Sequence, residues 1–197
     1  MCVDCADISF LPIPSRCYRC RKATAGFRVC ESCRSSSFIR RMQVVCELSG
    51  CARQLVFSLK FGRARRVGKE ISEHITGSFP RPEGYIIVPV PTATSRSRQR
   101  GYDQSVLIAK ELSRIWGLPL VQVLSRTTQS RQVGTKRETR IAQLKEAYRI
   151  RNDRSLRGAK VLLVDDVVTT GATLESAAMI LRRAGAKSID AIVFAQK

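Results

Sequence analysis

The sequence has no long apolar run and no recognisable export signal. None of its apolar stretches approaches the roughly 18 consecutive apolar residues that a membrane-spanning helix needs. The opening residues, MCVDCADISF, contain no basic segment followed by an apolar one. We therefore expect neither a membrane span nor a signal peptide, and we expect the chain to reside in the cytoplasm.

Acidic residues are also scarce. The 197 residues include 16 Asp and Glu against 35 Lys and Arg, which gives a formal net charge of +19. The surplus is spread along the chain and does not form a single tail, as is typical of a basic surface on a folded body. Such a surface attracts polyanions by charge alone, and nucleic acid is the commonest of them. The alternative is that the charge serves only solubility.

The chain divides into three regions by composition. Residues 1–36 are rich in cysteine, residues 37–83 form a basic connecting region that begins the second domain, and residues 84–197 alternate strand and helix patterns. This length suits one ordinary domain with a small additional module.

Alternation of strands and helices in the last region predicts an α/β fold, in which helices cover a mostly parallel sheet. The predicted strands are residues 85–90, 120–124, 160–166 and 188–195, and the predicted helices are 104–116 and 172–186. The strand over 160–166 is apolar on both faces, as buried parallel strands are. The polar stretch over 125–140 predicts a long functional loop.

The segment VLLVDDVVTTGAT, residues 161–173, has the most specific pattern. A buried strand leads into two carboxylates, Asp165 and Asp166, and a short loop of small residues then opens into a helix. Backbone N–H groups of the loop, the permissive Gly171 and the positive helix end predict a phosphate cradle. The two acids would repel a phosphate, so they suit ribose hydroxyls or Mg²⁺. The alternative is an ordinary strand end followed by a helix cap.

Four cysteines in the first region have the spacing C-x2-C-x9-C-x2-C, as Cys17, Cys20, Cys30 and Cys33. Disulfides are disfavoured in the cytoplasm, so paired cysteines there indicate metal or redox chemistry. Two tandem pairs in a loop-rich segment favour a structural zinc site with four thiolates. A redox-active C-x-x-C pair is the alternative.

The segment 161–173 resembles the phosphoribosyl pyrophosphate (PRPP) motif of type I phosphoribosyltransferases. The resemblance implies that Asp165 and Asp166 hold the ribose hydroxyls and are the catalytic acids, with Mg²⁺ held largely by the pyrophosphate. It also assigns the 5-phosphate to the loop residues Thr169, Thr170, Gly171, Ala172 and Thr173. In the family's reaction, pyrophosphate leaves C1 of the ribose and a nucleophile replaces it.

More of the chain resembles the ComF family of that fold. IIVPVPTATSRSRQRGYDQS, residues 86–105, is similar to its signature, although Asp103 stands where the family has asparagine. By position, the resemblance assigns pyrophosphate contacts to Val88, Pro89, Val90, Pro91 and Arg100, with Arg96 and Arg98 as further candidates. Residues 127–150 are similar to the family's mobile lid, with Gln132 and Arg140 aligned.

ComF proteins often begin with a double zinc ribbon, so Cys2 and Cys5 resemble the last pair of a first ribbon. They could also share the site of the other four cysteines. Cys46 and Cys51 have a different spacing and are interpreted as buried or incidental thiols, or as the missing pair.

The resemblance implies a protein of natural competence that acts on single-stranded DNA, alongside a helicase-like partner. The leading hypothesis is therefore PRPP binding coupled to DNA uptake. An active phosphoribosyltransferase acting on a base or another nucleophile is the rival, and a regulator whose ligand tunes nucleic-acid affinity is the third. Tyr18, Phe27 and Phe38 are candidates for stacking on bases, or for packing the small ribbon.

Overall fold

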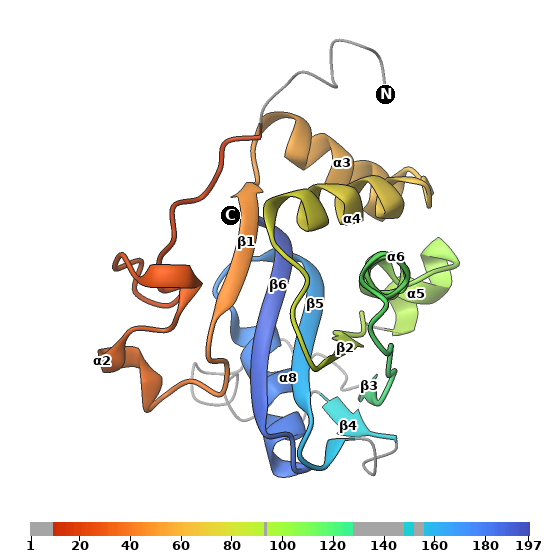
Figure 1. Ribbon diagram of the computed structural model, residues 1–197. Coiled ribbons are helices and arrows are strands. Elements are labelled where there is room, and N and C mark those ends of the chain that lie inside the picture. The colour runs from red at the N-terminus through yellow and green to blue at the C-terminus, as the bar shows by residue number, and fades with distance from the viewer. Residues whose placement is uncertain (1–9, 93, 128–147, 152–155) are drawn as a thin grey trace, which may run out of the picture.

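A parallel four-stranded sheet lies at the centre of the protein (Figure 1). The computed structural model describes residues 10–92, 94–127, 148–151 and 156–197. The strand order is β1-β6-β5-β2, and every neighbouring pair is parallel. The strands are β1 (Met42–Glu47), β2 (Tyr85–Pro89), β5 (Lys160–Val168) and β6 (Ser188–Gln196). The predicted parallel α/β architecture is confirmed.

Helices cover both faces of this sheet, and alternate strand residues point to opposite sides. Val161 and Leu163 of β5 pack into one core with α8 (Ala172–Arg183), whereas Leu162 and Val164 pack into the other. The second core contains the helices α3 (Gly50–Phe61), α4 (Val67–Ser78) and α6 (Gln104–Trp116). The expectation that β5 is buried on both faces is thus confirmed.

Helix α6 has the bounds that its sequence predicts. Asp103 is its N-cap and accepts a hydrogen bond from the Ser105 N–H at 3.1 Å. Gly117 ends it in the left-handed conformation, with φ of +61°. The shorter helix α5 (Thr94–Arg100) precedes it. No helix in the described ranges is long and apolar enough to cross a bilayer.

Three sequence predictions were wrong in extent, and one of them is the helix expected over 172–186, which ends at Arg183. The strand expected over 120–124 makes only a single parallel bridge, from Leu120 to Ile87. The chain then turns away, and β3 (Leu124–Arg126) pairs antiparallel with β4 (Tyr148–Ile150). Strand β5 also continues past the acidic pair to Val168, because β6 remains beside it as far as Gln196.

The cysteine-rich segment packs beside the β1 edge of the sheet, with η1 (Ala25–Phe27) and α2 (Glu31–Arg34) as its short helices (Figure 1). Its junction with the sheet is fixed by the fully buried Asp190 of β6. That carboxylate accepts hydrogen bonds from Arg40 Nε at 3.1 Å, Arg41 Nε at 2.6 Å and the Tyr85 hydroxyl at 2.7 Å. Strand β1 and helices α3 and α4, all from the basic connecting region, are part of the layered fold.

Candidate phosphoribosyl site and cysteine cluster

The acidic pair lies near the carboxyl end of β5, which is where open parallel sheets bind their ligands. Asp166 is 5% exposed, and Asp165 is partly buried beside it. The Asp166 N–H donates to Asp165 Oδ1 at 2.9 Å. Both side chains face one cavity, so the pair is available to hydroxyl groups or a cation.

Lys60 of α3 is the cation that accompanies this pair. Its Nζ lies 2.5 Å from Asp166 Oδ2. Burial raises the pKa of the Asp165 carboxyl well above its usual value, the neighbouring Asp166 charge raises it further, and Lys60 opposes both effects. Binding of a cation, or of a ligand that donates hydrogen bonds to the two carboxylates, is therefore favoured, because it reduces the repulsion between their charges. Sequence reasoning missed Lys60, because no local pattern connects the end of α3 to β5.

A cavity of about 430 Å³ opens over the acidic pair. It brings together the end of β2, the arginine-rich turn, the acids and the first turn of α8. Its lining residues are Lys60, Phe61, Val90, Pro91, Thr92, Gln99, Arg100, Gln104, Arg126, Asp165, Asp166, Val167 and Thr173. Val88 and Pro89, also predicted to contact pyrophosphate, are buried inside β2, and Arg98 is exposed on α5. Arg96 lies where side chains are not described.

The residues of the RGYDQ segment, 100–104, have different roles. Arg100 and Gln104 line the cavity, and Gly101 turns the chain with φ of +77°. Tyr102 is buried and donates its hydroxyl to the Leu59 carbonyl at 2.6 Å. This contact ties the turn to α3, the helix that supplies Lys60.

Asp103, the departure from the family's asparagine, has a structural role here. Besides capping α6, its Oδ2 accepts the Thr92 N–H at 2.7 Å. The carboxylate therefore links the loop after β2 to the start of α6, and both segments border the cavity.

The loop between β5 and α8 presents Thr169 and Thr170 to solvent, followed by the buried Gly171 with φ of +78°. A Cβ atom at position 171 would lie 2.7 Å from Cε2 of the Tyr18 ring. The glycine was expected to let the backbone approach a ligand, but the space beside it is filled by a side chain from the cysteine-rich segment. Gly171 is therefore required both by its backbone angle and by this ring.

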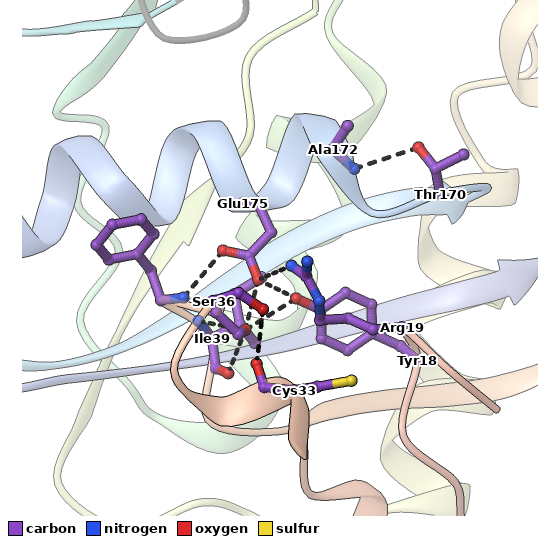
Figure 2. Close-up of polar contacts among 10 residues, drawn as sticks. Tyr18, Arg19, Cys33, Ser36, Ile39, Thr170, Ala172 and Glu175 are labelled. Atoms are coloured by element: carbon purple, nitrogen blue, oxygen red, sulfur yellow. Dashed lines mark hydrogen bonds and ion pairs between the residues drawn. The ribbon is translucent and has the colours of Figure 1, made fainter. Parts of the chain in front are cut away.

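Glu175, in the first turn of α8, binds the cysteine-rich segment at several points (Figure 2). Its Oε1 accepts hydrogen bonds from the Tyr18 hydroxyl and, at 2.5 Å, from the Ser37 hydroxyl. Its Oε2 accepts the Phe38 N–H at 3.0 Å, and Arg19 Nη1 lies 3.4 Å from Oε1. One carboxylate thus joins the helix that follows the β5–α8 loop to residues between the first two cysteines and to residues just after the fourth.

The four cysteines predicted to bind metal come together. The sulfur atoms of Cys17, Cys20, Cys30 and Cys33 all lie within 4.8 Å of one another. Tetrahedral zinc with Zn–S bonds of about 2.3 Å would place them about 3.8 Å apart, so the cluster fits this ion. Hydrogen bonds from the Ser32 hydroxyl and the Cys20 thiol lower the pKa of Cys30 to about 6, whereas the hydrogen bond to Cys30 and desolvation raise the pKa of Cys33 to about 12. Cys30 is therefore the member of this pair that more readily forms the thiolate that metals bind.

The remaining predicted residues fall elsewhere. Cys46 is fully buried in β1, and Cys51 lies at the start of α3, outside the cluster. The lid residues Gln132 and Arg140, and the cysteines Cys2 and Cys5, lie outside the described residues.

The three aromatic side chains suggested for base stacking differ in their exposure to solvent. Tyr18 is 5% exposed and committed to Glu175, and Phe27 packs against the core, so neither ring is free. Phe38 is 46% exposed. Sequence reasoning missed Phe57 and Phe61 of α3, which are the more exposed rings at 62% and 63%.

Comparison with known proteins agrees with this geometry. A family described as the phosphoribosyl transferase domain matches residues 103–197. Competence protein ComFC of Bacillus subtilis is 26% identical over 179 residues, covering 86% of this chain and 72% of the relative. Competence protein F of Haemophilus influenzae is 36% identical over 108 residues, covering 52% of this chain and 46% of the relative. DNA utilization protein YhgH of Escherichia coli is 29% identical over 163 residues, covering 76% and 69%.

Three observations indicate the same kind of protein: the named relatives, the parallel sheet with its acidic pair, and the four clustered cysteines. The chain is similar to the ComF proteins, and it has a type I phosphoribosyltransferase fold with an N-terminal cysteine cluster of the zinc-ribbon type.

Proposed function

We propose that this protein binds PRPP together with Mg²⁺ in the cavity over Asp165 and Asp166, and that it handles single-stranded DNA during DNA uptake in the cytoplasm. The observation that carries the first part is the meeting of two carboxylates, the start of α8 and the basic side chains Arg100 and Arg126 around one cavity.

Each part of the cavity suits one part of the ligand. The acids accept hydrogen bonds from the ribose hydroxyls, and the backbone N–H groups of residues 169–173 donate to the 5-phosphate. Arg100 and Arg126 attract the pyrophosphate, whose oxygens would carry most of the Mg²⁺ coordination. A structural zinc ion held by Cys17, Cys20, Cys30 and Cys33 would keep the cysteine-rich segment folded.

The DNA part is supported by charge and by the relatives. A net charge of +19 favours phosphate backbones. Two relatives are named as competence proteins and a third as a DNA utilization protein. The resemblance of the sequence motifs to the ComF family adds a helicase-like protein as a proposed partner.

Transfer of the phosphoribosyl group is the second candidate, and the acidic pair beside the cavity favours it. In that reaction the C1–oxygen bond to pyrophosphate breaks, a nucleophile forms the new bond to C1, and the bonding electrons leave with pyrophosphate. Carboxylates near C1 would stabilise the positive charge that develops there.

Calorimetric titration of PRPP with Mg²⁺, in the presence and absence of a single-stranded oligonucleotide, tests the proposal. We expect binding of PRPP, and an affinity that shifts when the oligonucleotide is added. The affinity for the oligonucleotide should fall steeply as salt is raised. PRPP binding that ignores DNA would favour the plain transferase, and an absence of PRPP binding would refute the assignment of the cavity.

A further inference from the structure

Two phenylalanine rings lie on the solvent side of α3. Phe57 is 62% exposed and Phe61 is 63% exposed, and their ring centroids are 5.0 Å apart. The other side of α3 packs into the core through Leu55, Val56 and Leu59. The two rings are therefore not needed to hold the helix, and they form a contiguous aromatic surface that water contacts.

This aromatic surface is surrounded by positive charge. No acidic residue occurs over 48–69, which contain six Lys and Arg residues, or over 84–102, which contain three. The Arg100 guanidinium lies over the Phe61 ring, 5.2 Å from its centroid. An acidic protein surface could pair with this charge, but its carboxylates would not stack on the rings.

The surface adjoins the cavity. Phe61, Lys60 and Arg100 all line it, so the aromatic pair continues from its rim along α3 toward Phe57 and the exposed Arg53. A ligand chain that left the cavity along α3 would pass over these rings.

We propose that Phe57 and Phe61 form a stacking platform for unpaired bases of single-stranded nucleic acid, beside the phosphoribosyl cavity. This inference rests on the proposed function and adds the surface through which the strand is held. Bases have planar faces that stack on aromatic rings whatever the sequence, while cations beside the rings bind the phosphates. Double-stranded nucleic acid fits less well, because its base faces are covered by neighbouring bases.

Fluorescence anisotropy of a labelled oligonucleotide tests the platform with paired changes in protein and DNA. Phe57→Leu and Phe61→Leu, separately and together, keep the charge and the apolar character but remove the ring faces. A second oligonucleotide of equal length carries abasic sites in place of its bases. Ile115→Ala is the control, because Ile115 is an exposed apolar side chain on another helix, α6, outside the cavity lining. Thermal unfolding checks that every variant is folded.

We expect the double variant to bind the normal oligonucleotide at least about fivefold more weakly than the wild type. Phe57 lies outside the cavity lining, so Phe57→Leu should weaken DNA binding by itself, and Ile115→Ala should not. The abasic oligonucleotide should bind wild type and double variant alike, because it offers nothing to stack.

Three results would overturn the platform. The first is equal affinity of wild type and double variant for the normal oligonucleotide, with salt-dependent binding intact; this refutes the platform and leaves the proposed DNA function standing. The second is a wild type that does not bind DNA, which removes both. The third is a dimeric wild type that the double variant turns into a monomer without loss of DNA affinity, which would assign the rings to self-association.

Discussion

The Tyr18 ring occupies the space beside Gly171, so that a Cβ atom on residue 171 would lie 2.7 Å from Cε2 of the ring. Tyr18 stands between the cysteines Cys17 and Cys20, and Gly171 ends the loop that precedes α8. The cysteine-rich segment and the loop between β5 and α8 thus share a contact surface, and the hydrogen bond from Tyr18 to Glu175 reinforces it.

Gly171→Ala should damage both stability and ligand binding. The new methyl group meets the Tyr18 ring, and alanine also tolerates the left-handed backbone poorly. We expect a loss of about 2–4 kcal/mol in the free energy of unfolding, from the backbone and the overpacking together. Gly117→Ala, which has a similar φ and open space around it, is the control and should cost only about 1 kcal/mol. Urea unfolding measures both, and equal losses would contradict the role of Tyr18.

Removal of the predicted zinc should disturb the loop between β5 and α8, which Tyr18 contacts. Cys17→Ser with Cys20→Ser deletes two of the four ligands, so we expect about one zinc ion per chain in the wild type and none in the variant. Because Tyr18 lies between these residues, PRPP affinity should also fall. Elemental analysis and calorimetry measure the two effects. Cys51→Ser, outside the cluster, should keep the metal, and freshly purified wild type without zinc would refute the site.

Asp190→Ala should be among the most destabilising changes at the junction of the two segments. The buried carboxylate accepts hydrogen bonds from Arg40, Arg41 and Tyr85, and its loss leaves the Tyr85 hydroxyl without its acceptor. We expect a loss of about 2–4 kcal/mol in the free energy of unfolding. Glu73→Ala breaks only an exposed pair with Lys69 and should change it by less than about 0.5 kcal/mol. Similar losses in the two variants would contradict the anchoring role.

The stability of the unliganded protein should depend on pH through Asp165. Burial and the Asp166 charge raise the pKa of its carboxyl above the unfolded value of about 3.9, so the folded state binds more protons than the unfolded state. This contribution is complete below about pH 3.9 and is lost as pH rises through the folded pKa. Urea unfolding at a series of pH values from about 4 upward should show the Asp165→Asn variant gaining stability relative to the wild type. A constant difference would contradict the shift.

Local signals made part of this fold predictable from sequence. Helix α6 has its cap residue Asp103 and its stop residue Gly117 immediately beside it, so its bounds are encoded within the segment itself. The strand with the acidic pair is similarly recognisable, because apolar residues on both faces run into two carboxylates. The spacing of four cysteines indicated their cluster.

Long-range contacts were not predictable in the same way. Lys60 meets Asp166, and Tyr18 meets Gly171, only because the sheet order brings separate segments together. Residues 120–124 have a strand pattern, yet only Leu120 bridges to Ile87 before the chain leaves to pair with β4. An alternating apolar pattern indicates which face of a segment is buried. It does not specify the strand with which a short segment pairs.

The most direct test of the account is a calorimetric titration of PRPP and Mg²⁺ into wild type and into the double variant Asp165→Asn with Asp166→Asn. Asparagine retains the size of each side chain, but it removes the negative charge and one of the two oxygens that accept hydrogen bonds from the ribose hydroxyls. We predict that the wild type binds and that the variant, still folded by thermal unfolding, binds at least about tenfold more weakly. Glu73→Gln, a distant exposed acid, should bind as the wild type does. Equal affinity in wild type and double variant would contradict the assignment of the acidic pair to the ribose.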